Sequence, residues 1–111
     1  MEIHQSEVQS TVVLRLVGRL DGLTSPDLGM QITTLIAQDK HKFILDFSQL
    51  DYISSAGLRV LLMLQKQVKV FGGKSILVNL KPDINHIFDI SGFGVIFSFA
   101  PSIEDALIAI A

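Results

Sequence analysis

Short apolar runs alternate along this chain with longer segments of helical periodicity, and no other feature constrains the fold as much. Residues 43–47 form a compact apolar run that is typical of a buried central strand. The preceding segment carries apolar residues at helical spacing, namely Leu28, Ile32, Leu35 and Ile36. Repeated units of this kind predict parallel strands joined by helical crossovers. The sequence therefore predicts an α/β fold with a mixed, mostly parallel sheet of four to five strands and about four helices.

The expected elements follow one another in the order β-β-α-β-α-β-α-β-α. We expect strands over residues 2–8, 11–17, 43–47, 75–80 and 94–99, and helices over residues 25–40, 56–71, 82–90 and 102–110. The first two strands pair as an antiparallel hairpin across a short turn, which makes one edge of the sheet antiparallel. Ser25 is the expected N-cap of the first helix, with Pro26 at the first helical position. Loops are expected over residues 18–22 and 48–54.

The composition restricts the classes of protein and partner. A chain of 111 residues fits one domain over residues 1–111, and its 49% apolar content suffices for a packed core. The net charge of −2 comes without a basic run, so no nucleic-acid partner is expected. The lack of cysteine excludes a disulfide scaffold, a Cys-ligated zinc site and a thiol nucleophile. Residues 1–10 lack a secretion signal. The longest central apolar stretch, residues 60–64, is too short to span a bilayer. We therefore expect a cytoplasmic protein with no membrane partner.

The segment from Leu50 to Arg59 holds the candidate site, because a strand ends there and a buried helix starts. Binding sites in open α/β sheets favour the carboxyl ends of strands. Ser55 has two roles open to it in this segment. It can be the N-cap of the helix and accept a hydrogen bond from a backbone amide. It can also accept a phosphate, because the amides and the positive end of the helix dipole tolerate a new negative charge.

The stretch Ser54-Ser55-Ala56-Gly57-Leu58 resembles the phosphorylation-site segment of anti-sigma factor antagonists, which are members of the STAS domain family. Their usual pattern is Asp-Ser-Ser-Gly-Leu at the start of a helix, and alignment on Gly57-Leu58 places Ser55 on the phosphorylated serine. Ser54 stands where the family often has aspartate, and Ala56 where it often has a second serine. The resemblance extends over nearly the whole chain. Three further segments carry it: Leu16-Val17-Gly18-Arg19-Leu20-Asp21, Phe71-Gly72-Gly73 and Phe88-Asp89-Ile90-Ser91-Gly92-Phe93.

The resemblance implies a STAS-type fold and a binding protein rather than an enzyme. Unmodified, such a chain binds an anti-sigma factor that is also a serine kinase, and the sigma factor is released. The kinase supplies the ATP and phosphorylates Ser55, with Ser54 as the fallback acceptor, and a PP2C-type phosphatase resets the cycle. No cofactor or metal of its own is implied. The expected partner-binding residues are Asp21, Gly22, Ser54, Ser55, Ala56, Gly57 and Arg59.

Two of these residues have a second reading. Asp21 is as readily explained as the first residue of an Asp-Gly turn after a strand. Arg59 lies four residues after Ser55, so both share one helix face, and its guanidinium could pair with a phosphate on that serine or simply point to solvent. The alternative function is a STAS domain that senses a ligand, serves a lipid-transport complex or acts as a stress-signalling scaffold. In that case Ser55 need never be phosphorylated.

Other short motifs in the sequence lack residues that the corresponding catalytic or binding sites require. Gly73-Lys74-Ser75 looks like the end of a P-loop, but Val68 stands at the required first glycine and a strand follows. A nucleophile elbow around Ser55 fails because Ile53 replaces its first glycine. A hydrolase would need an acid and histidine set from different elements, whereas the available set falls on or beside one short helix: Asp83, His86 and Asp89. The histidines show no metal-ligand spacing: His4, His41 and His86.

Overall fold

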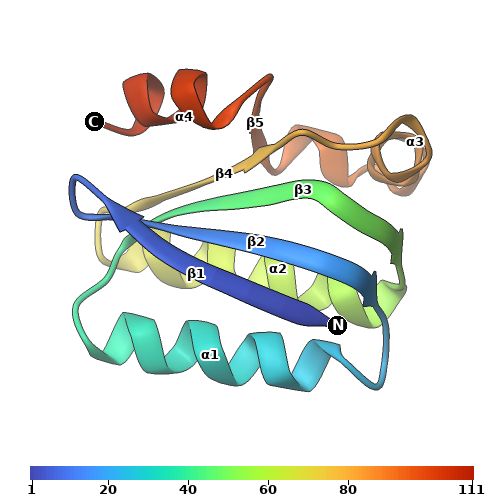
Figure 1. The fold of residues 1–111 in the computed structure, drawn as a ribbon, viewed down its shortest axis with the longest axis horizontal. Helices are drawn as coiled ribbons and strands as arrows, with labels where there is room; N and C mark the ends of the chain where they lie inside the picture. Colours follow the sequence, from blue (N-terminus) through green and yellow to red (C-terminus); the bar gives the residue numbers. More distant parts are fainter.

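One five-stranded sheet, in the order β1-β2-β3-β4-β5, organises the computed structural model, which describes residues 1–111 (Figure 1). The strands are β1 (Glu2–Val8), β2 (Thr11–Leu20), β3 (Lys42–Ile53), β4 (Lys74–Val78) and β5 (Ser98–Ala100). The helices are α1 (Ser25–Ala37), α2 (Ser55–Val70), α3 (Pro82–Ser91) and α4 (Ile103–Ile110), with a short 3-10 helix, η1 (Phe93–Val95). Strand β1 is antiparallel to β2, and all other neighbours are parallel. This arrangement confirms the predicted fold class, including the antiparallel edge.

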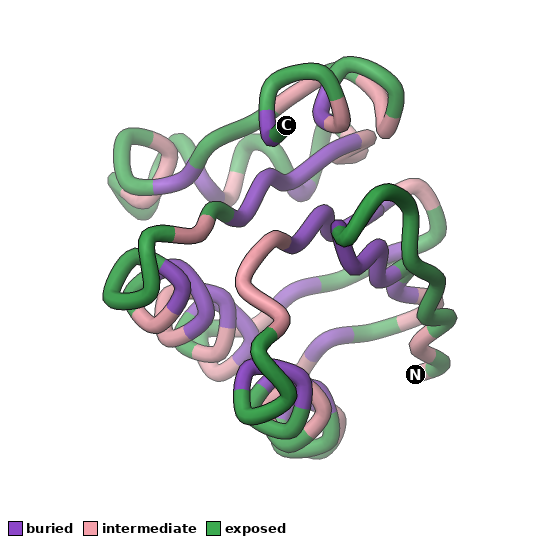
Figure 2. The backbone as a smooth tube through the Cα atoms, turned by 90° about the vertical axis from the view of Figure 1, so that its left-hand side faces the viewer, coloured by how far each residue is buried: buried purple, intermediate pink, exposed green.

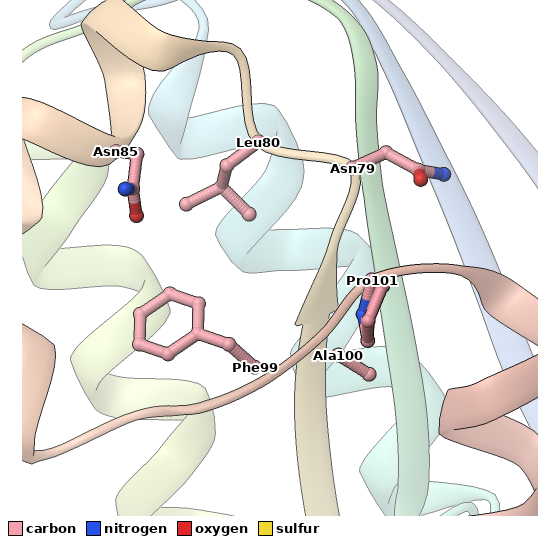
Figure 3. Close-up of a pocket in the computed structure, with 6 residues that line it drawn as sticks. All are labelled: Asn79, Leu80, Asn85, Phe99, Ala100 and Pro101. Atoms are coloured by element: carbon pink, nitrogen blue, oxygen red, sulfur yellow. The ribbon is translucent and has the colours of Figure 1, made fainter.

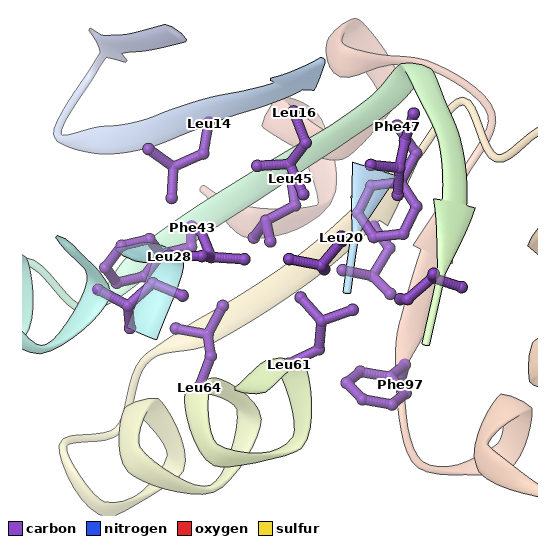
Figure 4. Close-up of a cluster of buried hydrophobic side chains, with 14 of the residues drawn as sticks. Leu14, Leu16, Leu20, Leu28, Phe43, Leu45, Phe47, Leu61, Leu64 and Phe97 are labelled. Carbon is purple, nitrogen blue, oxygen red and sulfur yellow. The ribbon is translucent and has the colours of Figure 1, made fainter. Parts of the chain in front are cut away.

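The main core lies between the sheet and the pair of helices α1 and α2, which cover one sheet face (Figure 1). Alternate residues of the two central strands point into it, and they meet apolar residues of the helices (Figure 4): Leu14, Leu16, Leu20, Phe43, Leu45, Phe47, Leu28, Leu61 and Leu64. The intervening strand residues point to the opposite sheet face, where they pack against Ala106 and Ile110 of α4. The strand residues of this smaller cluster are Val13, Ile44, Ile76 and Val78. Buried residues accordingly follow the central strands and the inward helix faces in Figure 2. Both sheet faces are covered here, which explains why these strands are continuous apolar runs.

Strands β2 and β3 are longer than the sequence predicted, and the two expected loops begin later in the chain than predicted. Strand β2 continues through residues 18–20, and β3 continues through residues 48–53. The two extensions pair with each other, from Val17 opposite Gln49 to Leu20 opposite Ile53. Two register shifts interrupt the pairing of β2 with β3, one just before Val17 and one after Gly18, and each places an extra residue in β3. The irregular register removes the alternation by which the segment could be recognised as strand.

Several other boundaries also differ from prediction. Strand β5 begins at Ser98 rather than at residue 94, because η1 follows the left-handed Gly92. Strand β4 ends at Val78, before the left-handed Asn79. Helix α1 ends at Ala37 rather than near residue 40. Its N-cap is Thr24, so Ser25 is the first helical residue and the predicted cap position is wrong by one.

Candidate partner-binding site at the start of α2

Helix α2 begins with two serines that have different structural roles. Ser54 is the N-cap, and its Oγ accepts a hydrogen bond from the backbone N–H of Gly57 at 3.3 Å. The Ser54 backbone N–H also donates to the carbonyl oxygen of Leu20 at 2.9 Å, which ties the turn to the end of β2. Ser55 is the first helical residue, and it is exposed. Of the two roles left open by the sequence, capping therefore belongs to Ser54, and the Ser55 hydroxyl makes no hydrogen bond within the chain.

Gly57 allows the first turn of α2 to lie directly on the ends of two strands. A Cβ atom at this position would come within 2.8 Å of Leu20 Cγ and 3.0 Å of Ile53 Cγ1. Such distances are shorter than van der Waals contact between carbon atoms. Gly57 is itself buried, so its contribution is to seat the helix and not to present a side chain. The turn that carries Ser55 is thus held against the sheet.

The Asp21 turn, residues 21–24, links β2 to α1 beside this helix start. The Asp21 carboxylate accepts hydrogen bonds from the backbone N–H groups of Leu23, at 3.0 Å, and Thr24, at 3.2 Å. The Thr24 hydroxyl accepts from the Asp21 N–H at 2.9 Å and donates to the carbonyl oxygen of Arg19 at 2.8 Å. The hydrogen bond from the Leu23 N–H is the main cause that lowers the pKa of Asp21 below its ordinary value. Partial desolvation raises this pKa, whereas the hydrogen bonds from Thr24 and the positive charge of Arg19 lower it further. Asp21 is therefore a turn residue, and its carboxylate stays ionised at neutral pH.

Two residues missed by the sequence analysis border the same turn. Arg19 and Tyr52 are opposite each other in the β2–β3 register, and the guanidinium carbon lies 4.2 Å from the centroid of the tyrosine ring. The Arg19 Nε is also 3.8 Å from an Asp21 carboxylate oxygen. Both residues fall in stretches that were predicted to be loops. Their pairing could not be found without the register of the two strands.

The residues expected to bind a partner come from two segments that meet at the carboxyl ends of β2 and β3 (Figure 1). Asp21 and Gly22 belong to the Asp21 turn, and the remainder belong to the cap and first turns of α2: Ser54, Ser55, Ala56, Gly57 and Arg59. Gly22, Ser55 and Arg59 are exposed, Asp21, Ser54 and Ala56 are half-buried, and only Gly57 is buried. Arg59 lies one helical turn after Ser55 on the same face. The structure thus brings the predicted residues together at the carboxyl ends of β2 and β3.

Other candidate groups lie elsewhere. Asp83, His86 and Asp89 are exposed residues of α3, as their spacing predicted. No three His, Asp or Glu side chains come together in a group that could hold a metal ion. A cavity of about 380 Å³ opens at the ends of β4 and β5, and it does not include the Ser55 turn (Figure 3); its lining is Asn79, Leu80, Asn85, Phe99, Ala100 and Pro101. No helix here has both the length and the apolar character that crossing a membrane requires.

Comparison with protein families matches residues 2–106 to the STAS domain. The chain belongs to the STAS domain family. It is 34% identical over 109 residues to BtrV of Bordetella bronchiseptica, which carries the name anti-sigma factor antagonist, across 98% of this chain and 94% of that protein. SpoIIAA, the Bacillus cell fate determinant, in its phosphorylated form is 27% identical with a TM-score of 0.77, across 99% of this chain and 100% of that one. A Thermotoga maritima protein has the same fold, with a TM-score of 0.93 at 17% identity over 97% of this chain and 93% of its own.

These relatives confirm the family that the serine segment suggested. The STAS match spans almost the whole chain, and the named relatives at comparable length are anti-sigma factor antagonists. Their names describe regulatory binding and no reaction. This STAS domain is therefore one of the anti-sigma factor antagonist family, with the mixed sheet and four helices of that fold.

Proposed function

We propose that this STAS domain binds an anti-sigma factor serine kinase in the cytoplasm and releases a sigma factor, and that phosphorylation of Ser55 ends the interaction. The observation that carries the proposal is the separation of roles between the two serines. Ser54 caps α2, whereas Ser55 is exposed and its hydroxyl is free at the first helical position. A family relative, SpoIIAA, has been solved in both unphosphorylated and phosphorylated forms.

The phosphoryl transfer would change the surface without unfolding the protein. The kinase transfers the γ-phosphoryl group of ATP to Ser55 Oγ, ADP leaves, and a base of the kinase takes the hydroxyl proton. The product carries about −1.5 to −2 charges at the positive end of the α2 dipole, where a negative charge is stabilising. A partner packed on the unmodified turn would then face a buried anion, which is costly without a counter-charge. The kinase therefore leaves, and a PP2C-type phosphatase would restore the serine by hydrolysis.

Ser55 is a better acceptor than Ser54 for a geometric reason. The Ser54 oxygen already accepts the Gly57 N–H, and its residue is half-buried against the end of β2. A phosphate on Ser54 would break the cap and crowd the turn. Ser55 has neither constraint.

The test combines site mapping with a binding titration. A purified anti-sigma factor serine kinase from the same organism and ATP should phosphorylate wild type on Ser55, as mapped by mass spectrometry, and should not phosphorylate Ser55→Ala. Ser55→Asp should bind the kinase at least tenfold more weakly than wild type, whereas Ser55→Ala should bind normally. Ser10→Asp is the matched control, because it adds the same charge to the exposed β1–β2 turn, where Ser10 has a left-handed φ of 68° that aspartate tolerates. Phosphate mapped to Ser54, or equal binding by Ser55→Asp and Ser10→Asp, would overturn the proposal.

A further inference from the structure

Leu23 is an apolar side chain presented to solvent from the centre of the Asp21 turn. Its relative exposure is 89%, although leucine is a residue that usually contributes to cores. A single exposed leucine on a flexible loop would need no explanation. Leu23 differs because the backbone that carries it is held by hydrogen bonds on both sides.

These hydrogen bonds fix the position of the Leu23 backbone before any partner arrives. The Leu23 N–H donates to the Asp21 carboxylate, and the Thr24 N–H donates to the same carboxylate. The Ser25 N–H donates to the Asp21 carbonyl oxygen at 2.8 Å, which closes the turn onto α1. The conformational entropy of the turn is therefore lost on folding and not on binding. Burying Leu23 in a partner would cost only the freedom of its own side chain.

The Asp21 turn that carries Leu23 lies next to the Ser55 turn and to an arginine and a tyrosine, two residue types that interfaces favour. The Asp21 turn is joined to the Ser55 turn through the hydrogen bond between the Leu20 carbonyl and the Ser54 N–H. On its other side, the Asp21 carboxylate neighbours Arg19, which stacks over Tyr52. Arginine and tyrosine are enriched at binding hot spots, and productive interfaces place an apolar centre inside a polar rim. Figure 1 shows the β2–α1 turn and the start of α2 at the same end of the molecule.

We propose that Leu23 is an apolar anchor that inserts into a hydrophobic pocket of the anti-sigma factor kinase when the kinase docks on the Ser55 surface. This inference rests on the proposed function, since it assigns a further contact to the same partner. The anchor lies outside the phosphorylated turn, so its contact is made equally before and during phosphoryl transfer. Uniform binding of this kind lowers KM without changing kcat.

The experiment uses the full chain and the purified kinase that phosphorylates wild type on Ser55. Leu23→Ala should weaken binding about tenfold or more in a calorimetric titration, which is the effect of truncating one of the minority of interface residues that contribute substantially. Its KM as a kinase substrate should rise by a similar factor while kcat stays unchanged. Leu23→Met keeps apolar volume and reach, so it should bind within about threefold of wild type. Ile108→Ala is the matched control, because Ile108 is 79% exposed on α4 and should have no effect on either measurement.

The outcomes separate this inference from the function on which it rests. Equal binding by wild type, Leu23→Ala and Ile108→Ala would overturn the anchor and leave the Ser55 switch intact. A fall in kcat with unchanged KM would also overturn it, because Leu23 would then act on the chemical step. If the kinase neither binds nor phosphorylates wild type, the proposed function fails and the anchor fails with it.

Discussion

The two adjacent serines at the start of α2 give a prediction in which stability and phosphorylation respond to different substitutions. Ser54→Ala removes the side-chain oxygen that accepts the Gly57 N–H and caps α2, a helix with one buried face. Loss of a serine cap costs ~0.5–2 kcal/mol of unfolding free energy. The observed hydrogen bond is 3.3 Å long, beyond the usual range for N–H···O bonds. We therefore expect the lower half of that range, about 0.5–1 kcal/mol.

Ser55→Ala should have little effect on stability. Ser55 is exposed at the first helical position, and its hydroxyl makes no hydrogen bond that could be lost. Alanine is also the better helix former. The unfolding free energy should stay within about 0.5 kcal/mol of wild type.

Thermal and urea unfolding followed by circular dichroism measure the stability difference. For a domain of this size, the Ser54→Ala cost corresponds to a fall in Tm of roughly 2–6 °C. Incubation of both variants with kinase and ATP gives the opposite order: Ser54→Ala should be phosphorylated on Ser55 and Ser55→Ala should not. The reasoning would be refuted if Ser55→Ala were less stable than Ser54→Ala. It would also be refuted if the kinase failed to phosphorylate Ser54→Ala.

Three more perturbations test the geometry around this turn. Gly57→Ala should lower the unfolding free energy by ~1–3 kcal/mol in urea melts, because its Cβ would press on Leu20; an unchanged midpoint would contradict the close packing. The folded pKa of Asp21 is depressed, so its support of the turn is complete above the ordinary value of 3.8 and is lost as the pH falls through the lower folded value. An NMR titration of the Asp21 carboxyl carbon with a midpoint at or above 3.8 would disprove this. If Arg59 pairs with phosphate on Ser55, phosphorylation should stabilise wild type by roughly 0.2–1 kcal/mol and Arg59→Ala should not show this gain; equal shifts in Tm would place Arg59 in solvent or against the kinase.

The order and type of the elements could be predicted from sequence because the central strands are covered on both faces. Phe43 and Leu45 face the main core while Ile44 faces α4, so the run is apolar throughout and easily recognised. The rest of β3 could not be recognised. After Phe47 its next buried residues are Leu50 and Ile53, three apart, a spacing more typical of a helix than of a strand. The two extra residues that β3 inserts against β2 produce this spacing.

The last strand was predicted too early for a related reason. Val95 and Ile96 are apolar and β-branched, which favours a strand. In the structure they lie in and after η1, and both are exposed, so no packing partner selects the strand conformation. The left-handed Gly92 turns the chain after α3 and starts the 3-10 helix instead.

The sequence placed a helix start at these two serines but could not assign its N-cap. Serine at either of two adjacent positions satisfies the preference for an N-cap, so the sequence alone could not decide between Ser54 and Ser55. The extension of β3 decides it, because strand geometry persists to Ile53 and leaves Ser54 as the half-helical residue. Arg19 and Tyr52 were missed because their mutual placement depends on the register of β2 and β3. Leu23 was missed because its exposure and the hydrogen bond from its N–H to Asp21 are features of the folded turn.

The helix cap and the proposed phosphate acceptor are different serines, and this separation matters physically for a phosphorylation switch. If one residue both capped α2 and accepted the phosphate, each cycle would exchange the hydroxyl cap for a bulky dianion at a turn tied to Leu20. Part of the free-energy change on phosphorylation would then go into rearranging the helix start. With the cap on Ser54, phosphorylation of Ser55 would leave the hydrogen bond from the Gly57 N–H to Ser54 Oγ in place. A phosphate charge on Ser55 would then act on the partner alone, at a helix end whose dipole favours it.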